Sequence, residues 1–301
     1  GEEHLATSEE FLALEHLPSR IVLVGGGYIA AEFARIAARA GAQVTVLQRG
    51  ERMLLQFDPD LVGWLMKAFD GMGVDVRTRT TVTAIQRAGD IFRVEASSDA
   101  GQETFEADLV VHAAGRRPAL DKLNLATADV TVEHGRLKLN EYLQSVTNPA
   151  IYAAGDAALV GPPLTPVSSH DAKVAAANLL EGNHAKPDYT GVPSVAFTSP
   201  PIAAVGMSDA AARESGLRVR IKSEFTSGWF TARREAERVY GYKTVVEEGT
   251  GRILGAHLVG PHVDETINVF ALAIRHGLTA DDLKSTMFAY PTGSSDIGYM
   301  L

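Results

Sequence analysis

The chain has 301 residues, of which 46% are hydrophobic and 22% are charged, as in ordinary globular proteins with room for two or three domains. Its formal charge of −9 argues against nucleic acid as a main partner, because binding phosphate backbones requires concentrated lysine and arginine. No apolar run approaches the ~18 residues of a membrane span, and no leader pattern opens the chain, so we expect a soluble cytoplasmic protein that binds no membrane. The sequence contains no cysteine and therefore no thiol nucleophile of its own.

The first strongly patterned stretch spans residues 20–34 and reads RIVLVGGGYIAAEFA. A short apolar run, three glycines and an alanine-rich segment predict a strand, a tight turn and a helix. In such a turn Gly25 allows the sharp bend, Gly27 lets a pyrophosphate approach the backbone, and the small Ala30 lets the helix pack closely on the strand. The sequence therefore predicts a dinucleotide-binding turn. The alternative is a glycine turn that binds nothing.

The second predicted strand, Gln43–Leu47, indicates which dinucleotide binds. Where an NAD-binding fold carries an acidic residue for the ribose 2′-hydroxyl, this chain has Gln48 followed by Arg49, with Arg52 close behind. An uncharged amide beside guanidinium groups suits a 2′-phosphate, because arginine offers a planar fork to phosphate oxygens. NADPH is thus favoured over NADH. The alternative is that these charges are simply solvated loop residues.

Further along, strands and helices alternate as in a doubly wound domain with a parallel core sheet, and the pattern changes twice after residue 114. The expected elements, in chain order, are helix Tyr28–Ala40, strand Gln43–Leu47, helix Pro59–Asp70, strand Val74–Arg77, a meander of Thr80–Gln86, Ile91–Ala96 and Glu103–Phe105, strand Leu109–Ala113, a short strand Ile151–Ala154, helix Pro166–Glu181, strands Val195–Phe197, Ile202–Val205, Val219–Ser223, Tyr242–Glu247 and Ile253–Val259, and helix Val263–Arg275. We therefore expect three segments: a nucleotide-binding domain over 1–114, a loop-rich segment over 115–186 that has too few strands to be a domain by itself, and an α+β domain over 187–301.

The histidines do not predict a metal site, because they lack the short paired spacings of metal ligands. The histidines without such a paired spacing are His112, His170, His184, His257, His262 and His276.

Five ordered motifs resemble those of the flavin-dependent pyridine nucleotide–disulfide oxidoreductases, the relatives of glutathione reductase, dihydrolipoamide dehydrogenase and mercuric reductase. The motifs are GGGYIAAEFA at 25–34, AAGRRP at 113–118, TNPAIYAAGD at 147–156, LTPV at 164–167 and VPSVAFTSPPIAAVG at 192–206. The resemblance covers essentially the whole chain. It implies FAD and a nicotinamide nucleotide as cofactors. It also implies that 115–186 is a partial FAD-binding segment and that 187–301 is a dimerisation domain through which a homodimer forms.

The resemblance also implies roles for single residues. Asp156 would bind the ribityl chain of FAD, and the helix after Leu164 and Thr165 would present its positive end to the flavin. Tyr28 would cover the flavin until nicotinamide displaces it, or else packs on its own helix. Glu32 would pair with a lysine from a part of the family's fold that this chain does not contain. The expected cofactor-binding residues are Gly25, Gly27, Tyr28, Ile29, Ala30, Gln48, Arg49, Arg52, Gly115, Asp156, Leu164 and Thr165.

The sequence departs from the family pattern in two places. Where the disulfide reductases of the family carry a catalytic histidine, this chain has Tyr290, and Ser295 stands in place of the glutamate that orients it, with Asp296 one position late. A phenol with a pKa near ~10 exchanges protons poorly at neutral pH compared with an imidazole near ~6.5. Tyr290 could donate a hydrogen bond to a substrate or be structural. The family's first FAD-binding unit, with its cysteine pair, is also missing, so we expect the C-terminal two-thirds of a longer enzyme.

These observations predict an FAD-dependent oxidoreductase that passes hydride from NADPH to flavin and on to an unidentified acceptor such as a disulfide, with Tyr290 and Glu32 as the catalytic candidates. Two alternatives remain open. One is a flavin reductase or transhydrogenase that needs no cysteine pair. The other is a nucleotide-binding and dimerisation fragment without catalysis.

Overall fold

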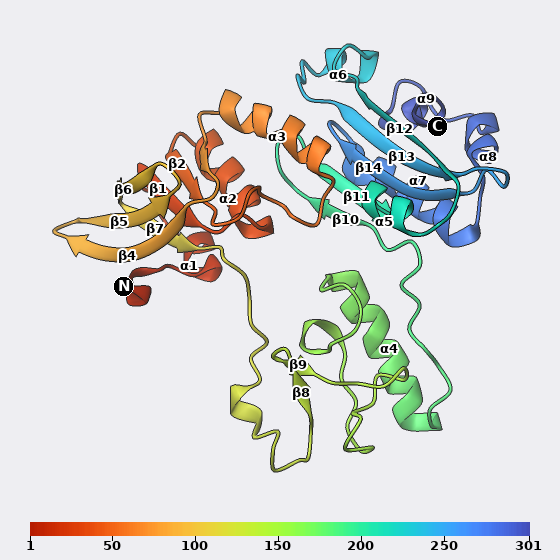
Figure 1. Cartoon of the computed structure of the whole chain (residues 1–301), viewed down its shortest axis with the longest axis horizontal. Coiled ribbons are helices and arrows are strands. Elements are labelled where there is room, and N and C mark those ends of the chain that lie inside the picture. Colours follow the sequence, from red (N-terminus) through yellow and green to blue (C-terminus); the bar gives the residue numbers. More distant parts are fainter. The chain divides into compact units, whose positions relative to one another are not determined.

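The computed structural model describes residues 1–301 and divides into two compact units (Figure 1). Unit 1 comprises Gly1–Gly115 together with Pro193–Leu301, and unit 2 comprises Arg116–Val192. The first and third segments expected from the sequence thus share one compact unit. The predicted fold class is confirmed, because unit 1 contains a parallel α/β sheet followed by an antiparallel sheet with helices.

The first part of unit 1 is built on a parallel sheet in the order β3-β2-β1-β7. β1 pairs in parallel with β2 on one side and β7 on the other, so the first strand lies inside the sheet, as in a doubly wound fold. The strands and helices of this part are β1 (Arg20–Val24), β2 (Gln43–Leu47), β3 (Asp75–Arg77), β7 (Leu109–His112), η1 (Glu2–His4), α1 (Ser8–Leu12), α2 (Tyr28–Arg39) and α3 (Pro59–Gly71).

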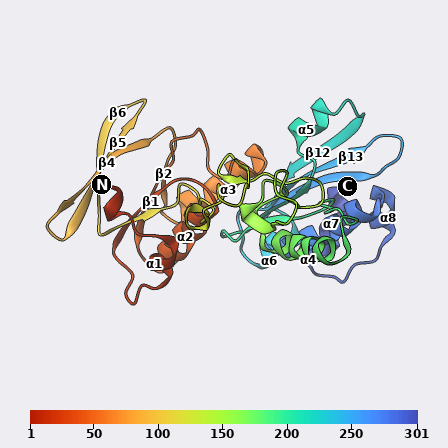
Figure 2. The same cartoon turned by 90° about the horizontal axis from the view of Figure 1, so that it is seen from below.

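Successive residues of β1 point to the two faces of this sheet, as in any β-strand. Ile21 and Leu23 join the core beneath α2 and α3, whereas Val22 joins a separate core under an antiparallel meander. The meander consists of β4 (Thr81–Ala88), β5 (Ile91–Ser98) and β6 (Gly101–Ala107). Figure 2 shows the meander standing apart from α1 and α2. The sheet is therefore covered on both faces, which explains the continuous apolar runs of its strands.

The second part of unit 1 is an antiparallel sheet in the order β10-β11-β14-β13-β12. Its elements are β10 (Ser194–Ala196), β11 (Ile202–Gly206), α5 (Asp209–Glu214), β12 (Val219–Phe225), α6 (Phe230–Arg234), β13 (Gly241–Glu247), β14 (Ile253–Val259), α7 (Val263–His276), α8 (Ala280–Ser285), η4 (Gly293–Asp296) and α9 (Ile297–Met300). Helix α7, expected over Val263–Arg275, is confirmed, and its Val263, Ile267 and Phe270 are buried against the sheet.

Helix α3 joins the two parts of unit 1. Its Trp64 packs against Phe225 of β12, with ring centroids 5.4 Å apart. Gly241 of β13 leaves no room for a side chain there, since a Cβ would lie 2.4 Å from the Trp64 ring. Ile202 and Val259 of the second sheet belong to the same apolar core as α2 and α3. The two parts are therefore packed as one body.

Unit 2 has little regular structure. It contains η2 (Asp121–Leu123), β8 (Val132–Glu133), β9 (Arg136–Leu137), η3 (Gly155–Ala157) and α4 (Thr165–Glu181). Its buried apolar cluster consists of Leu143, Val174 and Ala175. The predicted strand Ile151–Ala154 is wrong: only one isolated bridge, between Gln144 and Tyr152, forms there, because no neighbouring strand offers a continuous ladder. No helix in either unit is long and apolar enough to cross a membrane.

Candidate functional site: a glycine turn and the loop that covers it

The predicted dinucleotide turn lies between β1 and α2. Gly25 has φ of +119°, and a Cβ there would lie 2.3 Å from the carbonyl oxygen of Ala113, so only glycine fits. Gly27 precedes α2, and a Cβ built on it would meet nothing within 4 Å. Ala30 is fully buried against the sheet and Ile29 is partly buried beside it. The turn is thus closed on its inner side and open at Gly27, where the free N–H groups of α2 begin.

The loop after β2 lies against this turn. The side chain of Gln48 covers Gly26, where a Cβ would lie 2.9 Å from it, and Gln48 Nε2 donates to the Arg52 carbonyl at 3.2 Å. The backbone N–H of Leu54 donates to the Gly26 carbonyl at 2.7 Å. The structure therefore brings together the two stretches that the sequence assigned to the dinucleotide.

Two arginines of this loop differ in what they contact. Arg49 is exposed and has no protein partner. The guanidinium of Arg52 instead donates to three backbone carbonyls, those of Leu54, Leu55 and Phe57, at 2.9–3.1 Å. Arg52 thus stabilises the conformation of the loop. Its contact with a 2′-phosphate stays a prediction, and these three hydrogen bonds argue against it because they already occupy the guanidinium. Of the three residues assigned to the ribose, Arg49 is the one without a protein partner, whereas Gln48 Nε2 is already bonded to the Arg52 carbonyl.

Tyr28, the first residue of α2, is half-buried and lies edge-on to Phe57, with ring centroids 5.6 Å apart. Burial raises the pKa of its hydroxyl, despite hydrogen bonds with Gln56 and Ser194. One turn further along, Glu32 Oε1 accepts a hydrogen bond from the backbone N–H of Phe197 at 2.9 Å. Both side chains therefore border the glycine turn, and their expected roles toward a flavin stay predictions.

The residues expected to contact FAD lie mainly in unit 2. Asp156 is exposed in η3 and has no protein partner. Leu164 is the N-cap of α4 and makes no side-chain capping bond, and Thr165 begins the helix exposed. The helix packs on η3 so closely at Gly155 that a Cβ there would lie 2.4 Å from Ser168 Oγ. The carboxylate of Asp156 and the uncapped N-terminus of α4 thus lie in one small substructure. A carboxylate can accept hydrogen bonds from ribityl hydroxyls, and a helix N-terminus favours the negative charge of a reduced flavin ring. Gly115, with φ of +119°, ends unit 1.

Tyr290 lies in the last segment of unit 1, beyond α8. Its ring is 73% exposed and stacks on Phe230, itself 53% exposed, at 6.0 Å. Ser295 is part of a capping box with Thr292, and Asp296 accepts a hydrogen bond from the buried Tyr240 hydroxyl at 2.9 Å. Neither residue contacts Tyr290, so the structure does not rebuild the family's oriented proton donor.

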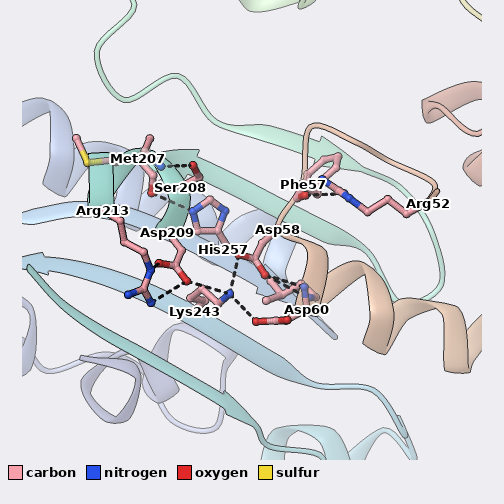
Figure 3. Close-up of polar contacts among 12 residues, drawn as sticks. Arg52, Phe57, Asp58, Asp60, Met207, Ser208, Asp209, Arg213, Lys243 and His257 are labelled. Atoms are coloured by element: carbon pink, nitrogen blue, oxygen red, sulfur yellow. Dashed lines mark hydrogen bonds and ion pairs between the residues drawn. The ribbon is translucent and has the colours of Figure 1, made fainter. Parts of the chain in front are cut away.

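Sequence reasoning missed the charged cluster beneath the loop (Figure 3). Asp58 is the N-cap of α3 and Lys243 comes from β13, and both side chains are almost fully buried. Two signals were present in the sequence. Asp58 followed by Pro59 is typical of a helix start, and Lys243 is the one charge inside the otherwise uncharged run Gly241–Val246.

A groove of about 530 Å³ opens between α3 and β3. Glu51, Arg52 and Met53 line one end of it, but none of the glycine-turn residues does. The groove therefore borders the loop of the candidate site but does not include the glycine turn.

Comparison with known proteins agrees with this arrangement. Residues 2–172 match the family model of the pyridine nucleotide-disulphide oxidoreductases, and residues 192–300 match the dimerisation domain of the same family. The chain is 34% identical to a mercuric reductase of Bacillus cereus over 287 residues, which is 95% of this chain and 45% of that protein. It is 31% identical to a dihydrolipoyl dehydrogenase of Bacillus subtilis, covering 96% of this chain and 62% of that enzyme.

Two further comparisons extend this likeness. An uncharacterized 19.7 kDa protein in a mercuric resistance operon of Staphylococcus aureus is 47% identical over its whole length, which is 60% of this chain. The HOCl-induced flavoprotein disulfide reductase RclA from Escherichia coli superimposes with a TM-score of 0.88 at 27% identity, over 98% of this chain and 67% of that one. The chain thus spans about half to two thirds of the length of these enzymes.

Proposed function

Since the chain belongs to the pyridine nucleotide-disulphide oxidoreductase family, we propose that it is the nicotinamide-nucleotide-binding and subunit-association part of an FAD-dependent oxidoreductase. NADPH binds over Gly25–Glu32 and Gln48–Arg52, and its hydride passes to FAD and then to an acceptor. The three expected segments, 1–114, 115–186 and 187–301, are part of this proposal. The flavin supplies the redox chemistry, and the chain positions the reactants and shields them from water.

One observation carries the proposal: the turn at Gly25–Gly27 is closed to side chains on one side and open on the other. The clash at Gly25 fixes the bend, and the free space at Gly27 lets a phosphate reach the N–H groups at the start of α2. Tyr28 lies next to this opening, where a nicotinamide ring would have to pass. The exposed Arg49 and the uncharged Gln48 support NADPH over NADH.

The acceptor is part of the same proposal. Several relatives are named mercuric reductases, and others are named dihydrolipoyl dehydrogenases or disulfide reductases. Tyr290 in place of a histidine, with no carboxylate to orient it, supports an acceptor whose reduction does not require an imidazole proton donor. The exposed stack of Phe230 on Tyr290 also supports a homodimer through the last segment, because exposed aromatic pairs are typical of interfaces.

The experiment titrates the purified 301-residue chain with NADPH and with NADH, following nicotinamide fluorescence. We expect both to bind, NADPH more tightly. The test variant is Gly27→Ala, which adds one methyl group where the fold leaves space but a phosphate would lie. We expect it to weaken binding at least about tenfold, roughly the loss of 1.4 kcal/mol, and to leave the melting temperature nearly unchanged.

The matched control is Gly63→Ala in α3, where a Cβ also meets nothing within 4 Å. It should bind like the wild type. A wild-type chain that binds neither nucleotide contradicts the proposal, and so does a Gly27→Ala chain that binds normally. A colourless chain that binds NADPH but not added FAD supports the non-catalytic alternative instead.

A further inference from the structure

Unit 1 buries a cluster of charged residues between its two parts (Figure 3). The ammonium group of Lys243, whose side chain is 4% exposed, lies 2.8 Å from Asp58, 2.6 Å from Asp60 and 3.8 Å from Asp209. Burial opposes the charged ammonium, but the bonds to Asp58 and Asp60 outweigh it and raise the pKa of Lys243. The neutral ring of His257 completes the cluster, since burial lowers its pKa.

Asp58 links this cluster to the start of α3. Its Oδ1 accepts the backbone N–H groups of Asp60 at 3.0 Å and Leu61 at 3.4 Å, and its Oδ2 accepts Lys243 at 2.8 Å. One carboxylate, 2% exposed, therefore both caps the helix and holds a lysine from β13. The loop that covers the glycine turn is therefore held at its C-terminal end, Asp58, by a strand of the antiparallel sheet.

From Asp58 the contacts continue to the glycine turn. The preceding residue, Phe57, gives its carbonyl to Arg52 at 3.0 Å and lies against the ring of Tyr28. The same guanidinium holds the carbonyl of Leu54, whose N–H donates to Gly26 at 2.7 Å. The path from Lys243 to Gly26 thus consists of hydrogen bonds and the peptide link between Asp58 and Phe57.

We propose that Lys243 is a positioning residue for dinucleotide binding. Its ammonium group contacts Asp58, Asp60 and Asp209 and does not contact the glycine turn. It acts by holding Asp58, and hence the loop that carries Gln48 and Arg49, against that turn. This inference rests on the proposed function. Because the loop as a whole is displaced when the lysine is lost, NADPH and NADH should be affected alike, whereas a change at Gln48 should affect their ratio.

The test replaces the lysine with a side chain of similar length and no charge, Lys243→Met, and measures the dissociation constants of NADPH and NADH well below the melting temperature. We expect both constants to rise roughly five- to thirtyfold, the change typical of one lost contact. The control is Arg20→Met, which removes the ion pairs with Asp108 and Glu106 at the opposite end of β1 from the glycine turn. It should lower the melting temperature and leave both constants unchanged.

A second variant separates positioning from stability. The double substitution Lys243→Met with Asp58→Asn removes the unpaired buried charge but keeps the helix cap, because asparagine caps as well as aspartate. We expect the double variant to melt at a higher temperature than Lys243→Met and to bind both nucleotides as weakly. If Lys243→Met does not fold, the dissociation constants of the double variant test the inference instead. If either folded variant binds the nucleotides with wild-type dissociation constants, the inference about Lys243 is overturned, but the proposed function is not. Failure of the wild-type chain to bind either nucleotide overturns both this inference and the proposed function.

Discussion

Unit 1 and unit 2 differ strongly in the size of their apolar cores. In unit 1, Leu23 lies in a core shared by three helices and by strands of both sheets, and the buried Lys243 has two close carboxylate partners. In unit 2 the buried apolar cluster consists of three residues. Each unit leaves one buried side-chain atom without a partner, Oδ1 of Asp171 in unit 2 and Nδ1 of His257 in unit 1. The side that would hold the nicotinamide nucleotide is thus preorganised, whereas the side that would hold the flavin is held by few contacts. The difference indicates that ligand binding should order unit 2 more than unit 1.

Truncating one buried leucine in each unit tests this comparison most strongly. We expect Leu23→Ala to lower the free energy of unfolding by about 3–5 kcal/mol, and Leu143→Ala by about 2–3 kcal/mol, because a small core can collapse into the space left. Both leucines are fully buried. Urea unfolding followed by tryptophan fluorescence separates the units, because both tryptophans, Trp64 and Trp229, belong to unit 1.

In that experiment Leu23→Ala should shift the fluorescence transition to lower urea, whereas Leu143→Ala should leave it in place and lower only the transition seen by hydrogen exchange in residues 136–160. An equal shift of the fluorescence transition in both variants would show that the units unfold together and would end the comparison.

A smaller effect is expected at the loop that covers the glycine turn. Gln48→Glu places a carboxylate where it would accept a hydrogen bond from a ribose 2′-hydroxyl and repel a 2′-phosphate. The ratio of NADPH to NADH affinity should therefore fall at least about tenfold. The lost bond from Nε2 to the Arg52 carbonyl should cost about 1 kcal/mol of stability. The affinity ratio, measured by titration, is therefore the decisive quantity.

The control for this change is Gln43→Glu, the same substitution at the other, exposed end of β2. It should leave the ratio as in the wild type. An unchanged ratio in Gln48→Glu would show that this residue does not face the ribose.

The smallest effect concerns the buried Asp171 of unit 2, whose Oδ1 has no hydrogen-bond partner. Burial raises the pKa of Asp171, although its Oδ2 accepts the Tyr189 hydroxyl at 3.1 Å. Because the folded-state pKa lies above the unfolded value near ~3.9, the folded protein loses stability as pH rises from that value through the raised pKa. Asp171→Asn removes this loss. It should raise the melting temperature of unit 2 at pH 7 by about 1–3 °C, and the gain should shrink toward pH 4.

Melting curves between pH 4 and pH 8 check this result, with the exposed Asp121→Asn as the control for net charge. A variant that melts below the wild type at every pH would show that the ionised carboxylate has a stabilising partner.

The sequence predicted the strand, glycine turn and helix over residues 20–39 well, because glycine spacing, apolar runs and helix composition are local signals that all indicated the same structure. It placed Gly25, Gly27 and Gln48 together before any contact was known. It did not predict that Arg52 would donate to three carbonyls of its own loop. Whether the guanidinium binds these carbonyls or a phosphate depends on the folded conformation of the loop, which the local sequence does not specify. The Asp58–Lys243 pair joins residues 185 positions apart, and no local pattern encodes such a contact. The strand expected at Ile151–Ala154 failed for a related reason, since a strand requires a neighbour that composition cannot supply.

Two edge strands of unit 1, β3 and β12, discourage growth by addition of another chain. Unpaired edge strands are templates for aggregation unless they are short or charged. β3 has three residues, and its Asp75 and Arg77 are joined by an ion pair at 2.8 Å. β12 is longer, but Arg220, Lys222 and Glu224 alternate along it. At the high concentrations used for crystallisation or storage, these two edges should therefore resist polymerisation, and neutral substitutions along β12 should open a route to fibres.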